Sequence, residues 1–313
     1  MSSTKLPIPR SADLRYKFLK CLGNGKDGHV VLAVPRSGDQ DLSSCVALKI
    51  LKGDSTTSVA RKMLEKLKGM ERDEDHLIAT VRDQQETIRD QQTIEHSEWH
   101  CMSYIPGCSI EQMLNAVYDD DGMPPTVVFH VLAELIRVQR HLKANGLSHA
   151  DLAADGNVML GNNGNDPWPS VTLVGFGGIS DYNQNKQIQH VFQLIAKMTR
   201  HHRAIPECWK LPSFQDEDLE TAEKVITTCD RQKLSPDEEQ SRALWNLWSV
   251  DAIRLKHNFR YDAALADLRN ALESSKITEQ DVARMATIPE VKMEVLKFDS
   301  TCVDEQVDEE QIG

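Results

Sequence analysis

The sequence predicts an α+β protein with two lobes, the first rich in strands and the second rich in helices. Short runs of β-branched and aromatic residues, separated by turn residues, fill about the first hundred positions. Apolar residues at helical spacing dominate the rest of the chain. The length of 313 residues, with 40% hydrophobic residues, is enough to bury a full core and favours about two domains or lobes.

Charge and composition exclude several classes of protein. The net charge of −12 argues against a protein that binds nucleic-acid backbones, and half of it lies in residues 276–313, with ten Asp or Glu against four Lys or Arg. The seven cysteines form no CxxC pair, which predicts free thiols in a reducing compartment and no zinc site. We expect no signal peptide and no membrane span. The expected location is therefore the cytoplasm, with the nucleus left open, and neither nucleic acid nor a membrane is an expected partner.

In the first lobe, apolar runs between turn residues predict five strands. They cover residues 16–22, 29–34, 45–51, 77–81 and 98–104. An amphipathic helix is expected over residues 59–70. A near-repeat of seven residues over positions 81–94 has too few copies for a coiled coil and favours a polar hairpin.

In the second lobe, apolar spacing predicts helices over residues 110–117, 127–145 and 188–198. The second of these ends before Gly146, which suits the left-handed position that follows many helices. A capping-box pattern begins a further helix at Ser235. Trp245 and Trp248 stand at helical spacing in that helix, and we expect them in the core.

A glycine-rich loop stands between the first two predicted strands. Residues 23–30 fit G-x-G-x-x-G-x-V, and glycines let backbone N–H groups approach a phosphate, although ordinary hairpin turns also collect glycine. A dinucleotide fold needs a helix after the loop, whereas a β-branched run follows here. Lys49 then lies inside an apolar strand, where a lysine either snorkels from an edge or meets an anion. Because Lys49 follows this loop, we favour the interpretation that its ammonium group binds a phosphate.

The loop and Lys49 resemble the first motifs of the protein-kinase superfamily, and further matches follow in the same order. The segment W-H-C-M-S-Y over residues 99–104 resembles the fifth strand and the hinge, with Met102 near the gatekeeper position. The tetrapeptide H-A-D-L at residues 149–152 resembles H-R-D-L, and Asn157 resembles the asparagine that follows it. The sequence V-G-F-G at residues 174–177 resembles the turn that carries D-F-G.

The resemblance implies a kinase-like domain over residues 13–275, with an N-lobe at 13–103 and a C-lobe at 104–275. Residues 1–12 are then a tail, and residues 276–313 an acidic extension. The resemblance implies ATP as the ligand and Asp151 as the catalytic residue, although an aspartate here also suits a simple turn. The nucleotide-binding residues that it implies are Gly23, Gly25, Gly28, Val30, Ala47, Lys49, Met102 and Asn157.

Two departures from the family pattern concern charge. Gly175 stands where the family has the aspartate that holds magnesium, and glycine has no ligand atom. The glutamate that pairs with the family lysine falls on Ala60 or Met63, and Glu65 is out of register.

Two further departures concern spacing. Asp151 and Asn157 are six residues apart where the family has five, so Gly156 takes the asparagine position or one residue bulges. Nine residues lie between Gly177 and the expected helix at Gln187, without an A-P-E motif. The segment on which the family docks peptide substrates is therefore almost absent.

These departures favour a pseudokinase, which would bind ATP weakly and without Mg²⁺, hold no metal, and act by binding a protein partner. We expect the partner surface at residues 178–233, where Trp209, Leu211 and Phe214 stand among acidic residues. One alternative is a divergent active protein kinase in which Asp181 or Asp155 replaces the missing metal ligand. Another is a small-molecule phosphotransferase similar to aminoglycoside and choline kinases, which need no A-P-E.

Overall fold

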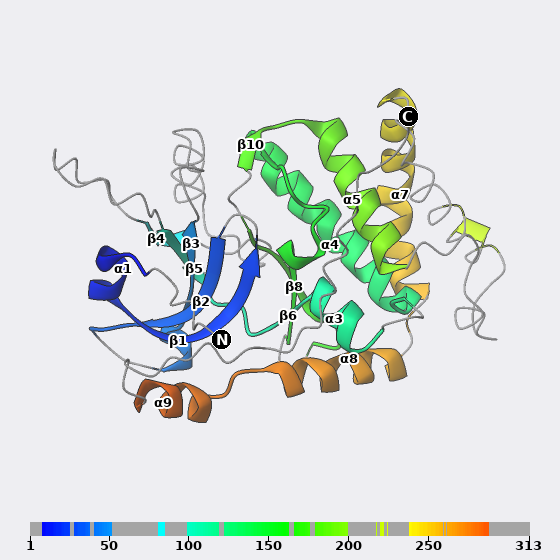
Figure 1. Ribbon diagram of the computed structural model, residues 1–313. Coiled ribbons are helices and arrows are strands. Elements are labelled where there is room, and N and C mark those ends of the chain that lie inside the picture. Colours follow the sequence, from blue (N-terminus) through cyan, green and yellow to red (C-terminus); the bar gives the residue numbers. More distant parts are fainter. Residues whose placement is uncertain are drawn as a thin grey trace, which may run out of the picture.

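The computed structural model describes residues 8–25, 28–37, 41–51, 81–84, 99–118, 122–162, 166–175, 179–199, 217, 220, 221, 224, 238–258, 260 and 262–287. A strand-rich lobe stands beside a lobe built mainly of helices (Figure 1). This arrangement confirms the two-lobed α+β fold that the sequence predicts. Within the described residues, none of the helices has the length and apolar character needed to span a membrane.

The N-lobe is one antiparallel sheet with the strand order β1-β2-β3-β5-β4. Its strands are β1 (Tyr16–Gly25), β2 (Gly28–Pro35), β3 (Val46–Leu51), β4 (Val81–Gln84) and β5 (Trp99–Ser103). Four of the predicted strands are confirmed, whereas β4 overlaps the predicted strand 77–81 only at Val81. The polar sequence of β4 suits its position at the edge of the sheet. The predicted helix at 59–70 and the rest of the polar hairpin lie outside the described residues.

One face of this sheet packs against the N-terminal helix α1 (Arg10–Arg15). The indole Nε1 of Trp99 donates a hydrogen bond to Ser11 Oγ at 2.9 Å, and Ala12 is buried in the same apolar cluster. Helix α1 therefore begins within the segment that the sequence suggests is a tail. Cys101 is buried in this cluster, and the four cysteines in the described residues are free thiols, as predicted.

The C-lobe is built around the apolar helix α4, on which α5 and α7 pack (Figure 1). Its helices are α3 (Ile110–Ala116), α4 (Pro125–Ala144), α5 (Gln184–Met198), α7 (Glu238–Asn258) and α8 (Asp262–Ser275). Its strands are β6 (Gly107–Ser109), β7 (Leu147–His149), β8 (Val158–Gly161), β9 (Ser170–Leu173) and β10 (Ile179–Asp181). Trp245 and Trp248 are buried against Phe192, which confirms them as core residues.

Helix α9 (Glu279–Thr287) lies within the predicted acidic extension. It packs on the N-lobe sheet beside β1, whereas α8 runs beneath the C-lobe (Figure 1). The chain therefore returns from the second lobe to the first after α8.

Candidate functional site

The N-lobe half of the candidate site is one face of the sheet. Val30 on β2 pairs with Lys49 on β3, which pairs with His100 on β5. Ala47 and Met102 form the neighbouring pair. Because residues directly opposite one another, and residues two apart along a strand, point to the same side, all five share one face. Met102 belongs to the apolar core of the C-lobe, so this face is turned toward the C-lobe.

The glycine-rich loop joins β1 to β2, as predicted, with Gly23 paired to Val30 and Gly25 to Gly28. A Cβ at Gly28 would overlap the carbonyl oxygen of Ile50 on β3, so close packing of two strands explains this glycine. A Cβ at Gly23 would meet no atom of the described residues within 4 Å. Packing therefore accounts for Gly28 but leaves Gly23 open as a position for close approach to a phosphate.

His100 is a buried residue of this face that the sequence analysis did not single out. It is 1% exposed, and among the described residues neither ring nitrogen has a hydrogen-bond partner. Burial, with a smaller effect of the Lys49 charge, lowers the pKa of His100 to about 4. The imidazole is therefore neutral at pH 7. In the sequence, the position of this histidine inside the mostly apolar strand β5 could have indicated a role in the site.

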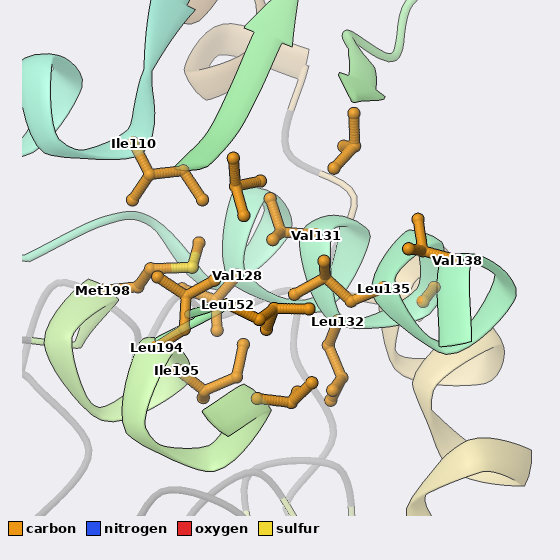
Figure 2. Packing of buried hydrophobic residues seen from close by; sticks show 14 of the residues in the cluster. Ile110, Val128, Val131, Leu132, Leu135, Val138, Leu152, Leu194, Ile195 and Met198 are labelled. Carbon is orange, nitrogen blue, oxygen red and sulfur yellow. The ribbon is translucent and has the colours of Figure 1, made fainter. Parts of the chain in front are cut away.

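The C-lobe half is the loop that follows β7, and the helical core fixes its position. Leu152 is fully buried between side chains of α4 and α5 (Figure 2). Two side chains of α5 bind loop carbonyls: Gln187 Nε2 donates to His149 O at 2.6 Å, and Lys197 Nζ donates to Ala153 O at 3.1 Å. The sequence analysis assigned neither side chain a role in the site. In the sequence, a glutamine at a buried, otherwise apolar position of α5 could have indicated the role of Gln187.

His149 links the loop to the end of β9. Its Nε2 donates a hydrogen bond to the carbonyl oxygen of Val174 at 2.8 Å, and burial lowers its pKa to about 4. The neutral ring therefore holds the backbone directly before Gly175. Smaller effects on this pKa come from Asp151, which raises it, and from Lys49, which lowers it. Two predicted site residues from opposite lobes thus lie within electrostatic reach of the same histidine.

The extra residue between Asp151 and Asn157 is taken up by the short 3₁₀ helix η2 (Asp155–Asn157). The N–H of Asn157 donates to Ala154 O at 2.9 Å. Its side-chain Nδ2 donates to the Asp151 carbonyl oxygen at 2.7 Å and to Asp151 Oδ2 at 3.3 Å. The amide that reaches Asp151 therefore belongs to Asn157 and not to Gly156.

Gly175 adopts a left-handed backbone conformation, with φ of +79°. A Cβ at this position would overlap Asn157 Oδ1 and lie 2.6 Å from Asn157 Cγ. The space that an aspartate side chain would enter is therefore filled by the asparagine. The described ranges hold no group of three or more His, Cys, Asp or Glu placed to bind a metal ion. Gly175 and the Asn157 side chain beside it therefore do not fit a magnesium ion of the kind that the family aspartate holds.

The connection from β10 to α5 is shorter than the sequence suggests. Helix α5 begins at Gln184, three residues before Gln187 and four before the predicted range 188–198, because Asn183 Oδ1 caps it by accepting from Lys186 N at 3.0 Å. Only Tyr182 and Asn183 lie between the strand and the helix. Asp181, one proposed substitute for the metal ligand, is exposed at the end of β10.

The contact between Gly175 and Asn157 is tested by comparing two alanine substitutions. Gly146 also has a left-handed φ, of +66°, but a Cβ there would meet nothing within 4 Å. We expect Gly146→Ala to lower the free energy of unfolding by about 1–2 kcal/mol through backbone strain alone. Gly175→Ala should lose about 1–3 kcal/mol more, because Asn157 must give up its bonds to Asp151. Urea unfolding measures both, and equal losses would contradict the overlap.

The family model described as protein tyrosine and serine/threonine kinase matches residues 16–215, which is more than half of the chain. Two crystal structures of the Mycobacterium tuberculosis PknI kinase domain also match this chain, each at 15% sequence identity over 88% of its length. For one, the match covers 99% of that domain with a TM-score of 0.48, and for the other, a double mutant of the same domain, it covers 98% with a TM-score of 0.47. On the strength of the family match, the chain belongs to the protein tyrosine and serine/threonine kinase family.

Proposed function

We propose that this chain is a pseudokinase that binds ATP weakly without Mg²⁺ and acts through a protein partner. One observation carries the proposal: Gly175 offers no carboxylate, and the Asn157 amide fills the space where one would lie. Phosphoryl transfer depends on a cation that neutralises the charge developing between the phosphates. With that ligand position closed, the N-lobe face keeps the residues suited to holding a nucleotide, while the means of transferring its phosphate is impaired.

The two-residue connection between β10 and α5 supports the same proposal. Protein kinases bind a peptide substrate along the segment that normally joins these elements, and Tyr182 and Asn183 are too few to form such a surface. A short connection would also suit a phosphotransferase that acts on small molecules. That alternative requires the same metal-binding carboxylate, so Gly175 counts equally against it.

The partner surface remains a prediction. Part of it, Ile179 to Thr199, forms β10 and α5 in the structure, and most of α5 faces the core. Trp209, Leu211 and Phe214 lie outside the described residues.

ATP binding without a metal is tested by thermal unfolding. We expect ATP in excess EDTA to raise the melting temperature of the full chain, because a ligand at 100 times its Kd adds about 2.7 kcal/mol of stability. Adding Mg²⁺ should change this shift little, because Gly175 supplies no metal ligand. Differential scanning fluorimetry with EDTA or with Mg²⁺ makes the measurement.

Two lysine substitutions complete this experiment. Lys49→Met should abolish the ATP shift, since it removes the ammonium from the nucleotide-binding face. Lys224→Met removes an exposed lysine that pairs with Glu220, and it should leave the shift intact. A shift that appears only with Mg²⁺ would contradict the proposal and favour an active enzyme.

A further inference from the structure

In the part of the chain that the structure describes, two connections join the lobes. The first connection follows β5 and runs directly into β6. The second is the three-residue link between α8 and α9. Leu268 and Leu272 of α8 are buried in the C-lobe core, whereas Val282 of α9 is buried in an N-lobe cluster. Each end of this short link is thus anchored in a different lobe (Figure 1).

Helix α9 is held on the N-lobe by an apolar contact. Val282 is fully buried and Ile277 is 7% exposed, which is unlike the solvated end that acidic composition suggests. Their buried neighbours in this cluster come from β1, β2 and the residue before β3, and they are Leu19, Leu32, Val34 and Cys45. Partly buried residues at its edge are Leu22, Leu42, Tyr104, Met285 and Ala286.

Polar contacts fix both ends of α9. At its start, Thr278 Oγ1 accepts a hydrogen bond from Asp281 N at 3.1 Å. Glu279 Oε2 accepts from the backbone N–H of Leu42 at 2.9 Å, in the short 3₁₀ helix η1 (Leu42–Ser44). At the other end, Lys17 Nζ on β1 donates to the carbonyl oxygen of Ala286. The helix therefore has one defined register on the sheet.

The surface under α9 is continuous with the candidate nucleotide-binding face. Leu32 pairs with Ala47, which pairs with Met102, so these three side chains form one row across β2, β3 and β5. Leu32 lies in the α9 cluster, while Met102 lies in the C-lobe core. Two edge residues of the α9 cluster, Leu22 and Tyr104, adjoin Gly23 of the glycine-rich loop and the end of β5.

We propose that α9 is a positioning element of the nucleotide-binding face: docked through Ile277 and Val282, it fixes β1, β2 and the start of the interlobe connection relative to the C-lobe. The effect on ATP rests on the proposed function above, whereas the effect on the sheet does not. Detaching α9 should remove the second of these two connections between the described parts of the lobes. The arrangement of the lobes that binds the ligand then becomes a minor state. The apparent Kd rises in inverse proportion to the fraction of the protein that remains in this state.

Matched substitutions on one helix test this. Val282→Asp places a carboxylate in the apolar contact, and Ala283→Asp places the same group on the exposed side of α9. We expect Val282→Asp, but not Ala283→Asp, to speed amide hydrogen exchange about tenfold or more in β1, β2 and residues 103–105 of the ligand-free protein. The Kd for ATP in EDTA should rise by about tenfold for Val282→Asp only.

Two truncations keep the test decisive if Val282→Asp fails to fold. A chain that ends after Thr287 keeps α9 and should behave as the full chain does, whereas one that ends after Ser275 should show the effects of Val282→Asp. Unchanged exchange in β1 and β2 after loss of α9 would overturn the proposal, as would faster exchange with an unaltered Kd for ATP. If the full chain binds no ATP, the proposed function fails, and the exchange data alone still decide whether α9 positions the sheet.

Discussion

Lowering the pH from 7 to 5 is expected to destabilise this protein steeply, because three buried histidines are neutral in the folded state. Burial lowers the pKa of His100, His130 and His149 from 6.5 to about 4. Below pH 6.5 the unfolded chain takes up protons that the folded chain does not bind. The contribution of these neutral histidines to the free energy of unfolding is therefore fully present above pH 6.5 and is lost as the pH falls toward 4.

The expected size follows from proton linkage. Each of these histidines removes about 1.4 kcal/mol per pH unit between the two pKa values, so three together remove about 4 kcal/mol per unit. Domains are commonly stable by only about 5–15 kcal/mol, so acid unfolding should begin well above pH 4. Urea unfolding at pH 7.0, 6.0 and 5.5 measures this slope. An unchanged unfolding midpoint across that range would contradict the prediction.

A single substitution isolates one of the three contributions. His100→Leu removes a ring whose two nitrogens have no partner among the described residues. It should therefore reduce the pH slope by about 1.4 kcal/mol per unit and stabilise the protein at pH 5.5. Met102→Leu on the same strand alters packing but removes no imidazole, so its pH slope should match that of the parent chain. His130 is less suitable, because its Nε2 donates to Pro169 O at 2.8 Å and its ring stacks on Trp168.

Much of the fold could be predicted because its signals are local. The runs in β1, β2 and β3 and the apolar helix α4 are bounded by turn and capping residues that act within a few positions of the chain. The docking of α9 could not be predicted in the same way. Its burial depends on Val282 meeting Leu19 and Leu32, more than 240 residues earlier in the sequence, while the acidic residues around it favour a solvated end.

The candidate site shows the same division. Motifs located Lys49 and Asp151 because each motif is a short segment, and the structure places both near His149. Spacing alone could not decide between Gly156 and Asn157, since the 3₁₀ turn that settles it depends on tertiary contacts. The sequence showed that Gly175 lacks a metal ligand. The overlap of its missing Cβ with the Asn157 amide required the folded loop.

Phosphoryl transfer by this chain is expected to be negligible, with either protein or small-molecule acceptors. Loss of one well-placed electrostatic contact commonly lowers a rate by about 10²–10³, and here the Gly175 position and the peptide-docking segment are both altered. A radiolabelled ATP assay with Mg²⁺, using generic proteins and amine or sugar acceptors, makes the measurement. Robust autophosphorylation that Asp151→Asn abolishes would show an active kinase, and labelled amine or sugar would show a small-molecule phosphotransferase.

Restoring the family aspartate should not restore transfer. In Gly175→Asp the new Cβ enters space held by Asn157, so that amide must rotate and lose its hydrogen bonds to Asp151. The left-handed φ of +79° adds strain that glycine avoids. The substitution therefore supplies a carboxylate while disordering the loop that carries Asp151, and no gain in labelling is expected. If Gly175→Asp raised phosphoryl transfer by tenfold or more, the Asn157 side chain would have to move aside at little energetic cost. In that case the missing carboxylate alone, and not the filled space, would limit phosphoryl transfer in the parent chain.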